Sequence, residues 1–326
     1  MIKKIIKRSL LGIVGALVLA SLVISVLYFI DRNKRFKELE ANSQLAETSA
    51  GPIEYKIYGD EGPIILNFHG TPGGYDQGTS YEGVRTLVPS RPGYLRTPLE
   101  VGKTPAEQAR AFAALLESLN IEKVVVSGAS GGGPSAICFA ALFPEKTSAL
   151  ILSMPVSQAW EPPEGAQSSF MQSDFLTWAL ASLMKNDSFL KAILKVIIPD
   201  QDTRQLILED PKKIEGVKGI LWSIWPPSKR YPGQENDIMQ FQSLALPASK
   251  IKAPTLIIHG SEDINVPASQ SKKLAEQIPG SKLVIMEGVD HLGILSKSEE
   301  IDKIINEFLE KVNAGKSDGE AITRRL

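Results

Sequence analysis

The sequence predicts an α/β fold: a mostly parallel sheet with helices on both faces, an inserted helical cap, and an N-terminal transmembrane helix. Two observations predict the sheet. The first is that short apolar runs bounded by turn residues alternate with amphipathic helical segments, and the second is that these runs are continuously apolar. Continuous apolar runs are typical of parallel strands that are buried on both faces. The third observation is the absence of any charge over residues 10–30.

Composition and charge exclude several kinds of partner. The chain has 326 residues, 43% of them hydrophobic and 22% charged, which is globular composition. Residues 1–40 hold eight Lys/Arg and three Asp/Glu, so the net charge of −1 divides into +5 there and −6 in the rest. A mildly acidic body predicts no nucleic-acid binding. The single cysteine, Cys138, and three widely spaced histidines predict no disulfide framework, no metal site and no cofactor.

The N-terminal segment is predicted to anchor the chain in a membrane. Residues 1–9 form a basic head, and the 21 residues of 10–30 make a helix of roughly 30 Å, the thickness of the hydrocarbon layer. Residues 31–50 are polar and predict a stalk. The alternatives are a signal peptide cleaved after 18–20 and a buried core helix. The apolar run at 10–30 is longer than that of a signal peptide, which favours an anchor. Four Lys/Arg lie on each side, and the short head favours an extracytoplasmic domain.

The core is predicted to comprise residues 51–154 and 251–312. Strands are expected at 53–58, Ile64–Phe68, Arg85–Pro89, 123–127, 149–153, 255–259 and 282–286. Thr104 and Glu107 form a capping box around Pro105, and apolar residues at helical spacing follow, so 104–120 is a helix. Further helices are expected from the glycine-rich turn after 127 to about Phe143, near 267–278, and over 301–312.

Two segments lie outside this alternation. Residues 155–250 contain Pro, Trp and apolar residues at helical spacing but no clear strand, and they predict an inserted helical cap. Within it Trp178, Leu183, Met184 and Phe189 are candidates to line an acyl pocket, although such stripes are more often the core of the cap. Residues 313–326 are polar and predict a mobile tail.

A G-x-S-x-G motif lies between the strand at 123–127 and the helix that follows it. Gly128, Ser130 and Gly132 occupy its fixed positions, so the Ser130 hydroxyl is expected on a sharp turn at the carboxyl end of the sheet. The helix N-terminus beside it favours developing negative charge. A tight glycine turn without catalytic function, or one that cradles a phosphate, is the alternative.

Three further features favour nucleophilic catalysis. Asp263 follows the strand at 255–259, and His291 follows the strand at 282–286, so the chain order is Ser, Asp, His. A serine hydroxyl needs a base to take its proton, and the base needs a carboxylate to orient it. The glycine-rich loop at 69–74 follows an earlier strand, and the amides of Thr71 and Gly131 are the expected oxyanion donors.

With these motifs, residues 51–312 resemble the capped α/β-hydrolases, a superfamily of esterases, lipases and proline iminopeptidases. The resemblance rests on the G-x-S-x-G turn, on Gly260 to Asp263, on Asp290-His291, on the loop His-Gly-Thr-Pro-Gly-Gly at 69–74, and on Ser90-Arg91-Pro92-Gly93-Tyr94. The nucleophile motif lacks the Trp that is typical of the iminopeptidases. Only one clear strand precedes the oxyanion strand, where the family has two, so the sheet is expected to be one strand short.

Alternative roles are open for several residues. His69 and His259 are expected to be structural, hydrogen-bonded at strand ends. Asp290 and Glu262 are weaker candidates for the acid that pairs with His291. Asp76 and Gln77, in the oxyanion loop, are expected to make structural hydrogen bonds.

The resemblance and the residues together imply a membrane-anchored serine hydrolase. Ser130 is the expected nucleophile, His291 the base and Asp263 the residue that orients it, and the expected substrate is a small-molecule ester or other acyl compound. Amide or peptide hydrolysis is the enzymatic alternative, and a binding protein that has lost catalysis is the alternative from another class.

Overall fold

The structure is a computed structural model of the chain, and it describes residues 2–78, 83–161, 172–198, 200–292, 296–314 and 324–325. The chain divides into two units, Met1–Asn42 and Ser43–Leu326, which are described separately below.

The first unit is one helix, α1, Ile2–Ala41. Among the described residues it is the one helix that is long and apolar enough to cross a membrane, by length and composition. The first half of the predicted stalk at 31–50 belongs to the same helix, which continues to Ala41. The residues after 30 favour this continuation: Lys34 and Glu38 form an i,i+4 ion pair at 3.8 Å, and Arg32 stacks over the ring of Phe36.

The second half of the predicted stalk is wrong, because residues 44–48 form an edge strand of the sheet. This strand, β1 (Gln44–Thr48), pairs antiparallel with β2 (Gly51–Tyr58) through a tight turn. Its side chains are mostly exposed, Leu45 included, so it lacks the apolar alternation by which a strand is recognised in a sequence. The sheet is therefore not short of the second strand that the family has before the oxyanion strand.

The second unit is built on a nine-stranded sheet in the order β1-β2-β4-β3-β5-β6-β7-β8-β9. The pairs β1–β2 and β2–β4 are antiparallel and all the others are parallel, as predicted. The remaining strands are β3 (Ile64–Phe68), β4 (Arg85–Pro89), β5 (Val124–Ala129), β6 (Thr147–Ser153), β7 (Thr255–Gly260), β8 (Lys282–Met286) and β9 (Arg324–Arg325). Of the predicted tail at 313–326, residues 315–323 and 326 lie outside the described residues, and β9 pairs with β8.

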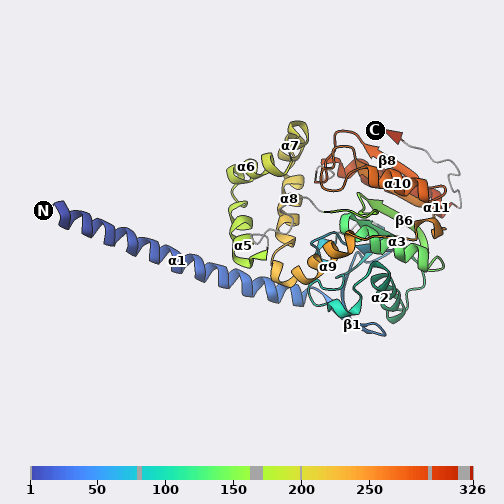
Figure 1. The fold of residues 1–326 in the computed structure, drawn as a ribbon, viewed down its shortest axis with the longest axis horizontal. Helices are drawn as coiled ribbons and strands as arrows, with labels where there is room; N and C mark the ends of the chain where they lie inside the picture. The colour runs from blue at the N-terminus through green and yellow to red at the C-terminus, as the bar shows by residue number, and fades with distance from the viewer. Residues whose placement is uncertain are drawn as a thin grey trace. The chain divides into compact units, whose positions relative to one another are not determined.

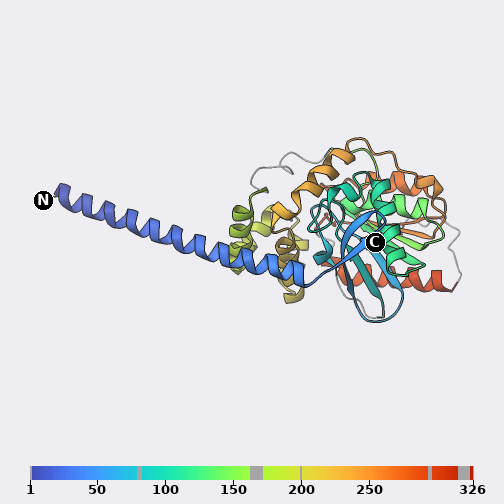
Figure 2. The same cartoon turned by 90° about the horizontal axis from the view of Figure 1, so that it is seen from below.

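Helices cover both faces of the sheet, as Figures 1 and 2 show. One core packs α2 (Pro105–Ser118), α3 (Gly133–Leu142) and α10 (Ser269–Gln277) against one face. The other face packs against α11 (Ser298–Asn313) through Ile301, Ile304 and Phe308. The predicted capping box is confirmed, since Thr104 and Glu107 exchange side-chain and backbone hydrogen bonds at the start of α2.

The described part of the segment between β6 and β7 is helical, as predicted. Its helices are α5 (Asp174–Leu183), α6 (Asp187–Ile197), α7 (Gln201–Leu208), α8 (Pro211–Ser223) and α9 (Tyr231–Phe241), and Figure 1 shows them beside the sheet. Polar side chains cap the first four of these helices at their N-termini: Ser173, Asn186, Asp200 and Asp210. The cap has a core of its own, which includes Met184, Leu190 and Leu194 and against which Leu292 packs.

The parallel strands end at one edge of the sheet, which positions the site. β3, β5, β7 and β8 run in the same direction, so the loops that follow them lie at that edge. Those loops carry the residues that the sequence singles out.

Candidate active site

Ser130 sits on the turn between β5 and α3. β5 ends at Ala129, a short 3-10 turn spans Ser130–Gly132, and α3 begins at Gly133. The φ angle of Ser130 is 48°, in the left-handed region that non-glycine residues rarely occupy. A backbone of this kind costs about 1–3 kcal/mol and is typical of functional turns, where it exposes the side chain.

The three residues predicted to act together lie in hydrogen-bond contact. His291 Nε2 is 3.1 Å from Ser130 Oγ, and His291 Nδ1 is 2.6 Å from Asp263 Oδ2. Ser130 and Asp263 are 133 residues apart in the chain, and the sheet edge brings both to His291. The arrangement can move a proton from the serine hydroxyl to the imidazole while the carboxylate orients the ring.

The surroundings of Asp263 keep its carboxylate ionised. Burial opposes the charged form, but hydrogen bonds from His259 and His291, the charge of His291 and the Val266 amide outweigh it, so the pKa of Asp263 lies well below its usual range. Its Oδ1 accepts the backbone N–H groups of Asn265 and Val266 at 2.9 and 2.8 Å. The side chain is fully buried, whereas His291 is partly exposed.

The carboxylate that contacts His291 is therefore that of Asp263 and not that of a neighbour in the chain. The side chain of Glu262 is exposed and accepts a 3.3 Å hydrogen bond from Ser261. Asp290 is buried next to His291 in the chain, but the described contact of the ring nitrogen Nδ1 is with Asp263.

His259 is a second imidazole beside the same carboxylate. Its Nε2 lies 2.8 Å from the Val266 carbonyl and 3.3 Å from Asp263 Oδ2, and its Nδ1 lies 2.7 Å from Ser271 Oγ. A carbonyl only accepts hydrogen bonds, so Nε2 carries a proton that it donates to Val266. The predicted structural hydrogen bonding of His259 is confirmed, but its proximity to Asp263 is not apparent in the sequence.

Thr71 and Gly131, the expected oxyanion donors, are adjacent in space. A Cβ atom at Gly131 would overlap Thr71 Oγ1, and one at Gly70 would lie 3.6 Å from Ser130 Cβ. Only glycine at position 131 lets the turn approach the loop this closely. The oxyanion loop therefore lies directly against the nucleophile turn.

His69 holds the start of the oxyanion loop. Its Nδ1 donates to the Gly70 carbonyl at 2.8 Å, and its Nε2 accepts the Arg91 backbone N–H at 2.9 Å. Burial and the charge of Arg91 put the pKa of His69 well below 6.5, so the ring is neutral. The predicted structural role of His69 agrees with these contacts.

Asp76 and Gln77 make the expected structural hydrogen bonds, and their partners are two cap residues, Arg230 and Ser223. Arg230 is fully buried and donates to Asp76 Oδ1 and Oδ2 at 3.1 and 2.8 Å and to the Gly73 carbonyl at 2.7 Å. Gln77 donates to Ser223 Oγ at 3.1 Å. These bonds tie the oxyanion loop to a segment more than 140 residues later in the chain.

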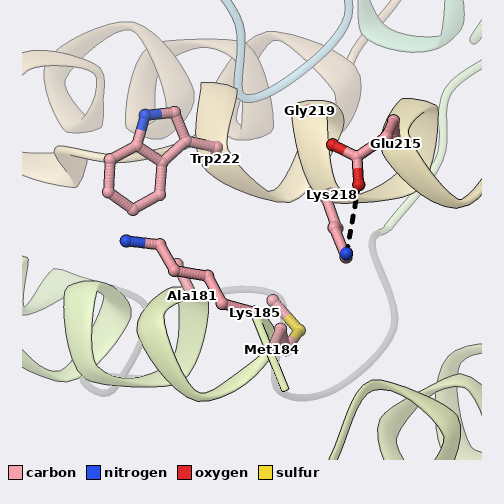
Figure 3. A pocket seen from close by; sticks show the side chains of 7 residues that line it. All are labelled: Ala181, Met184, Lys185, Glu215, Lys218, Gly219 and Trp222. Carbon is pink, nitrogen blue, oxygen red and sulfur yellow. Dashed lines mark hydrogen bonds and ion pairs between the residues drawn. The ribbon is translucent and has the colours of Figure 1, made fainter. Parts of the chain in front are cut away.

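The four candidate acyl-pocket residues have different surroundings. Met184 lines a cavity of about 290 Å³ between α5 and α8, shown in Figure 3, together with Ala181, Lys185, Glu215, Lys218, Gly219 and Trp222. Phe189 packs on the cap core, Trp178 is buried beside Phe175, and Leu183 is 53% exposed. Two of the four, Met184 and Phe189, belong to or pack on the core of the cap, which is the alternative that the sequence left open.

Within the part of the chain that the structure describes, no group of three or more His, Cys, Asp or Glu side chains could hold a metal ion.

Similarity to known proteins agrees with this architecture. The chain is 30% identical over 278 residues to the uncharacterized hydrolase YcgS of Bacillus subtilis strain 168, covering 80% of this chain and 95% of that protein. It is 26% identical over 273 residues to a 2-hydroxy-6-oxo-6-phenylhexa-2,4-dienoate hydrolase of Burkholderia cepacia, covering 76% and 88%.

A solved structure and a family model agree with these relatives. An α/β hydrolase fold protein from Nakamurella multipartita superposes with a TM-score of 0.76 at 31% identity, covering 82% of this chain and 98% of that one. Residues 63–298 match the family model described as alpha/beta hydrolase fold. The chain therefore belongs to the α/β-hydrolase fold family and is related to hydrolases.

Proposed function

We propose that this protein is a membrane-anchored serine hydrolase that cleaves carboxylic esters through an acyl-enzyme. The observation that carries the proposal is the hydrogen-bonded series Ser130–His291–Asp263, with distances of 3.1 and 2.6 Å. The left-handed backbone of Ser130 and the adjacent oxyanion loop support it. Helix α1 would anchor the chain, with the second unit on the extracytoplasmic side.

The proposed reaction has two halves. Ser130 Oγ attacks the ester carbonyl carbon while His291 Nε2 takes the serine proton, and Asp263 stabilises the imidazolium. The amides of Thr71 and Gly131 bind the oxyanion of the tetrahedral intermediate. This intermediate expels the alcohol, to which His291 returns the proton. Water, deprotonated by His291, then attacks the acyl-enzyme, and collapse of the second intermediate releases the acid and restores the Ser130 hydroxyl.

The surroundings of the nucleophile favour an apolar acyl substrate. Phe241 lies next to Gly131, and Val156 donates its amide to the Ser130 carbonyl at 3.0 Å. Both belong to a small apolar cluster with Val266, whose backbone N–H donates to Asp263 Oδ1 at 2.8 Å. An apolar wall beside the acyl-enzyme suits an aliphatic or aromatic acyl group.

The buried charges beside the oxyanion loop favour an ester over an aminoacyl amide. A buried ammonium group is stabilised best by a carboxylate that is not already paired with another cation. Asp76 is already paired with Arg230, and Asp237 is paired with Arg91. Neither carboxylate is available to bind the ammonium group of such a substrate.

The test uses the full chain in detergent with a panel of substrates. p-Nitrophenyl esters of increasing acyl length, a thioester, an aminoacyl amide and a 2-hydroxy-6-oxo acid are compared, and Ser130→Ala is the control. Turnover of the esters with kcat/KM at least about 100-fold above that of the amide is the expected result. Better turnover of the amide would reject ester specificity.

A fluorophosphonate probe separates an enzyme from a binding protein. The probe reacts with an activated serine, so the wild type should be labelled and Ser130→Ala should not. An unlabelled wild type would reject catalysis by Ser130, whatever the substrate.

A further inference from the structure

The oxyanion loop is bonded to a buried cluster whose central carboxylate comes from the cap. Asp237, on α9, is 3% exposed and lies 166 residues after Thr71 in the chain. Its Oδ2 accepts the Thr71 hydroxyl at 2.5 Å and the Tyr94 hydroxyl at 2.5 Å. A carboxylate forms strong hydrogen bonds with such donors, and each of the partners of Asp237 described here donates to it.

Arg91 connects this carboxylate to the backbone of the same loop. It donates to both oxygens of Asp237 at 2.8 and 2.6 Å, a bidentate pair buried to 1% and 4% exposure. It also donates to the carbonyls of His69 and Gly70 at 2.9 and 3.2 Å and to Thr71 Oγ1 at 2.9 Å. Three consecutive residues of the loop are thus bonded to a single guanidinium.

Tyr94 completes the cluster as a neutral donor. Burial and the charge of Asp237 raise its pKa well above 10.0, which keeps the phenol protonated. Its ring makes an edge-to-face contact with the ring of His69, with 4.9 Å between the centroids, which packs Tyr94 against the start of the loop. The positive charge of Arg91 and the negative charge of Asp237 neutralise each other within the cluster.

The hydrogen bonds described between the cluster and Thr71 are made to its side-chain hydroxyl. Thr71 Oγ1 is engaged by both Asp237 and Arg91, and Gly131 packs against the same side chain. A displacement of about 1 Å at a catalytic group can cost about 100-fold in rate. The hydroxyl contacts therefore constrain the position of an amide that the reaction needs.

We infer that Asp237 and Arg91 are positioning residues, which hold the Thr71 amide in place as an oxyanion donor and so make the rate of acyl transfer depend on cap helix α9. The inference rests on the proposed function, since it assigns an oxyanion to the site. It assigns no substrate contact to either residue. The cap, through Asp237 on α9, is then part of the apparatus that orients the oxyanion loop.

Two variants of the full chain in detergent test the inference. Thr71→Val keeps the backbone N–H and the volume of the side chain but removes the hydroxyl that Asp237 and Arg91 hold. Asp237→Asn weakens the acceptor. Asp187→Asn, at an exposed ion pair of the cap with Lys218 at 3.8 Å, is the matched control. Thermal unfolding shows which variants fold. Thr71→Val leaves both members of the buried Arg91–Asp237 pair in place, so it still tests the inference if Asp237→Asn fails to fold.

The expected result is a fall in kcat of about 10–100-fold in both variants with KM within about threefold of wild type, because a whole oxyanion donor contributes about 10²–10³-fold. Thr71→Ser, which restores the hydroxyl, should recover most of the rate lost in Thr71→Val. Asp187→Asn should match the wild type.

A thionoester separates the positioning role from a general structural one. Thiocarbonyl sulfur is a weak hydrogen-bond acceptor, so a substrate with C=S gains little from the oxyanion donors. Both variants should therefore lose more activity on the ester than on its thionoester, lowering the ratio of the two kcat/KM values by about tenfold. An equal loss on both substrates, or kcat within about threefold of wild type, would overturn the inference.

The rate of fluorophosphonate labelling tests the inference independently of substrate. Phosphonylation also develops charge on an oxygen in the oxyanion site, so it should be about 10–100-fold slower in both variants. If the wild type is labelled but cleaves no ester, the proposed ester specificity fails, and the labelling rates still decide the role of Asp237. Equal labelling of the wild type and both variants would reject that role.

Discussion

His259 Nε2 lies 3.3 Å from Asp263 Oδ2, the same carboxylate oxygen that contacts His291 at 2.6 Å. One carboxylate thus faces two imidazoles, of which His291 reaches Ser130 and His259 is bonded to Val266 and Ser271. The side chain of His259 is fully buried, so it contacts the carboxylate from within the protein, while His291 is partly exposed.

Replacing His259 should separate orientation of the acid from packing. Gln places an amide N–H donor near the position of Nε2, whereas Leu offers none. We expect His259→Leu to lower kcat by about tenfold more than His259→Gln, because Asp263 loses a hydrogen-bond donor. Both should lose about 1–3 kcal/mol of stability as Ser271 loses its partner. Steady-state kinetics and urea unfolding provide these values, and equal kcat in the two variants would contradict the orienting role.

The assignment of the acid can be tested against its neighbours. Asp263→Asn should lower kcat by about 10⁴-fold, because an amide favours the wrong tautomer of His291. Glu262→Gln should change kcat by less than about threefold, because its side chain is exposed and bonded to Ser261. Asp290→Asn is the second control, measured with the same ester. A larger loss in either control than in Asp263→Asn would mean that the acid is misassigned.

The edge strand β1 lies at the start of the second unit, which begins at Ser43. Ser43 donates to the buried carboxylate of Glu54 at 2.7 Å, and Tyr55 donates to Gln44 at 2.5 Å. A fragment of residues 43–326 should be soluble and folded, whereas 51–326 loses these bonds and exposes the edge of β2. We expect the shorter fragment to be about 2–4 kcal/mol less stable, at about 1 kcal/mol for each lost hydrogen bond.

Urea unfolding and gel filtration of the two fragments check this prediction. Equal stability would show that β1 contributes nothing to the sheet. Aggregation of both fragments would show that the anchor helix is needed for solubility.

Acid should destabilise the fold through His69. The pKa of His69 is lowered in the folded protein, so between that value and 6.5 the unfolded chain binds more protons than the folded one. Stability from this residue is complete above pH 6.5 and falls as pH drops below it, by up to about 1.4 kcal/mol per pH unit. The carboxylate of Asp263, with its depressed pKa, contributes its own loss only below about pH 4.

Urea unfolding of the 43–326 fragment at pH values from about 7.5 to about 5 measures this slope. Most Asp and Glu side chains titrate below this range and contribute little to the slope. His69→Asn carries no titratable ring and should lose the slope over that window. An identical slope in both proteins would assign the acid sensitivity to another group.

The sequence alone was sufficient for the features that depend on neighbouring residues. The strands Ile64–Phe68 and Arg85–Pro89, the cap of α2 at Thr104 and the turn at Ser130 each follow from local periodicity or from residues within one helical turn. Strand direction then brings Asp263 and His291 to the same edge as Ser130, because parallel strands end together.

Tertiary structure decided the partners of charged and polar groups. The pairs Arg91–Asp237 and Arg230–Asp76 join residues 146 and 154 positions apart, and no periodicity connects them. The edge strand β1 was missed because one neighbour and solvent surround it, so its side chains need no apolar pattern. The pairing of carboxylates with guanidinium groups depends on how the cap packs against the oxyanion loop. Neighbouring residues in the sequence do not predict that contact.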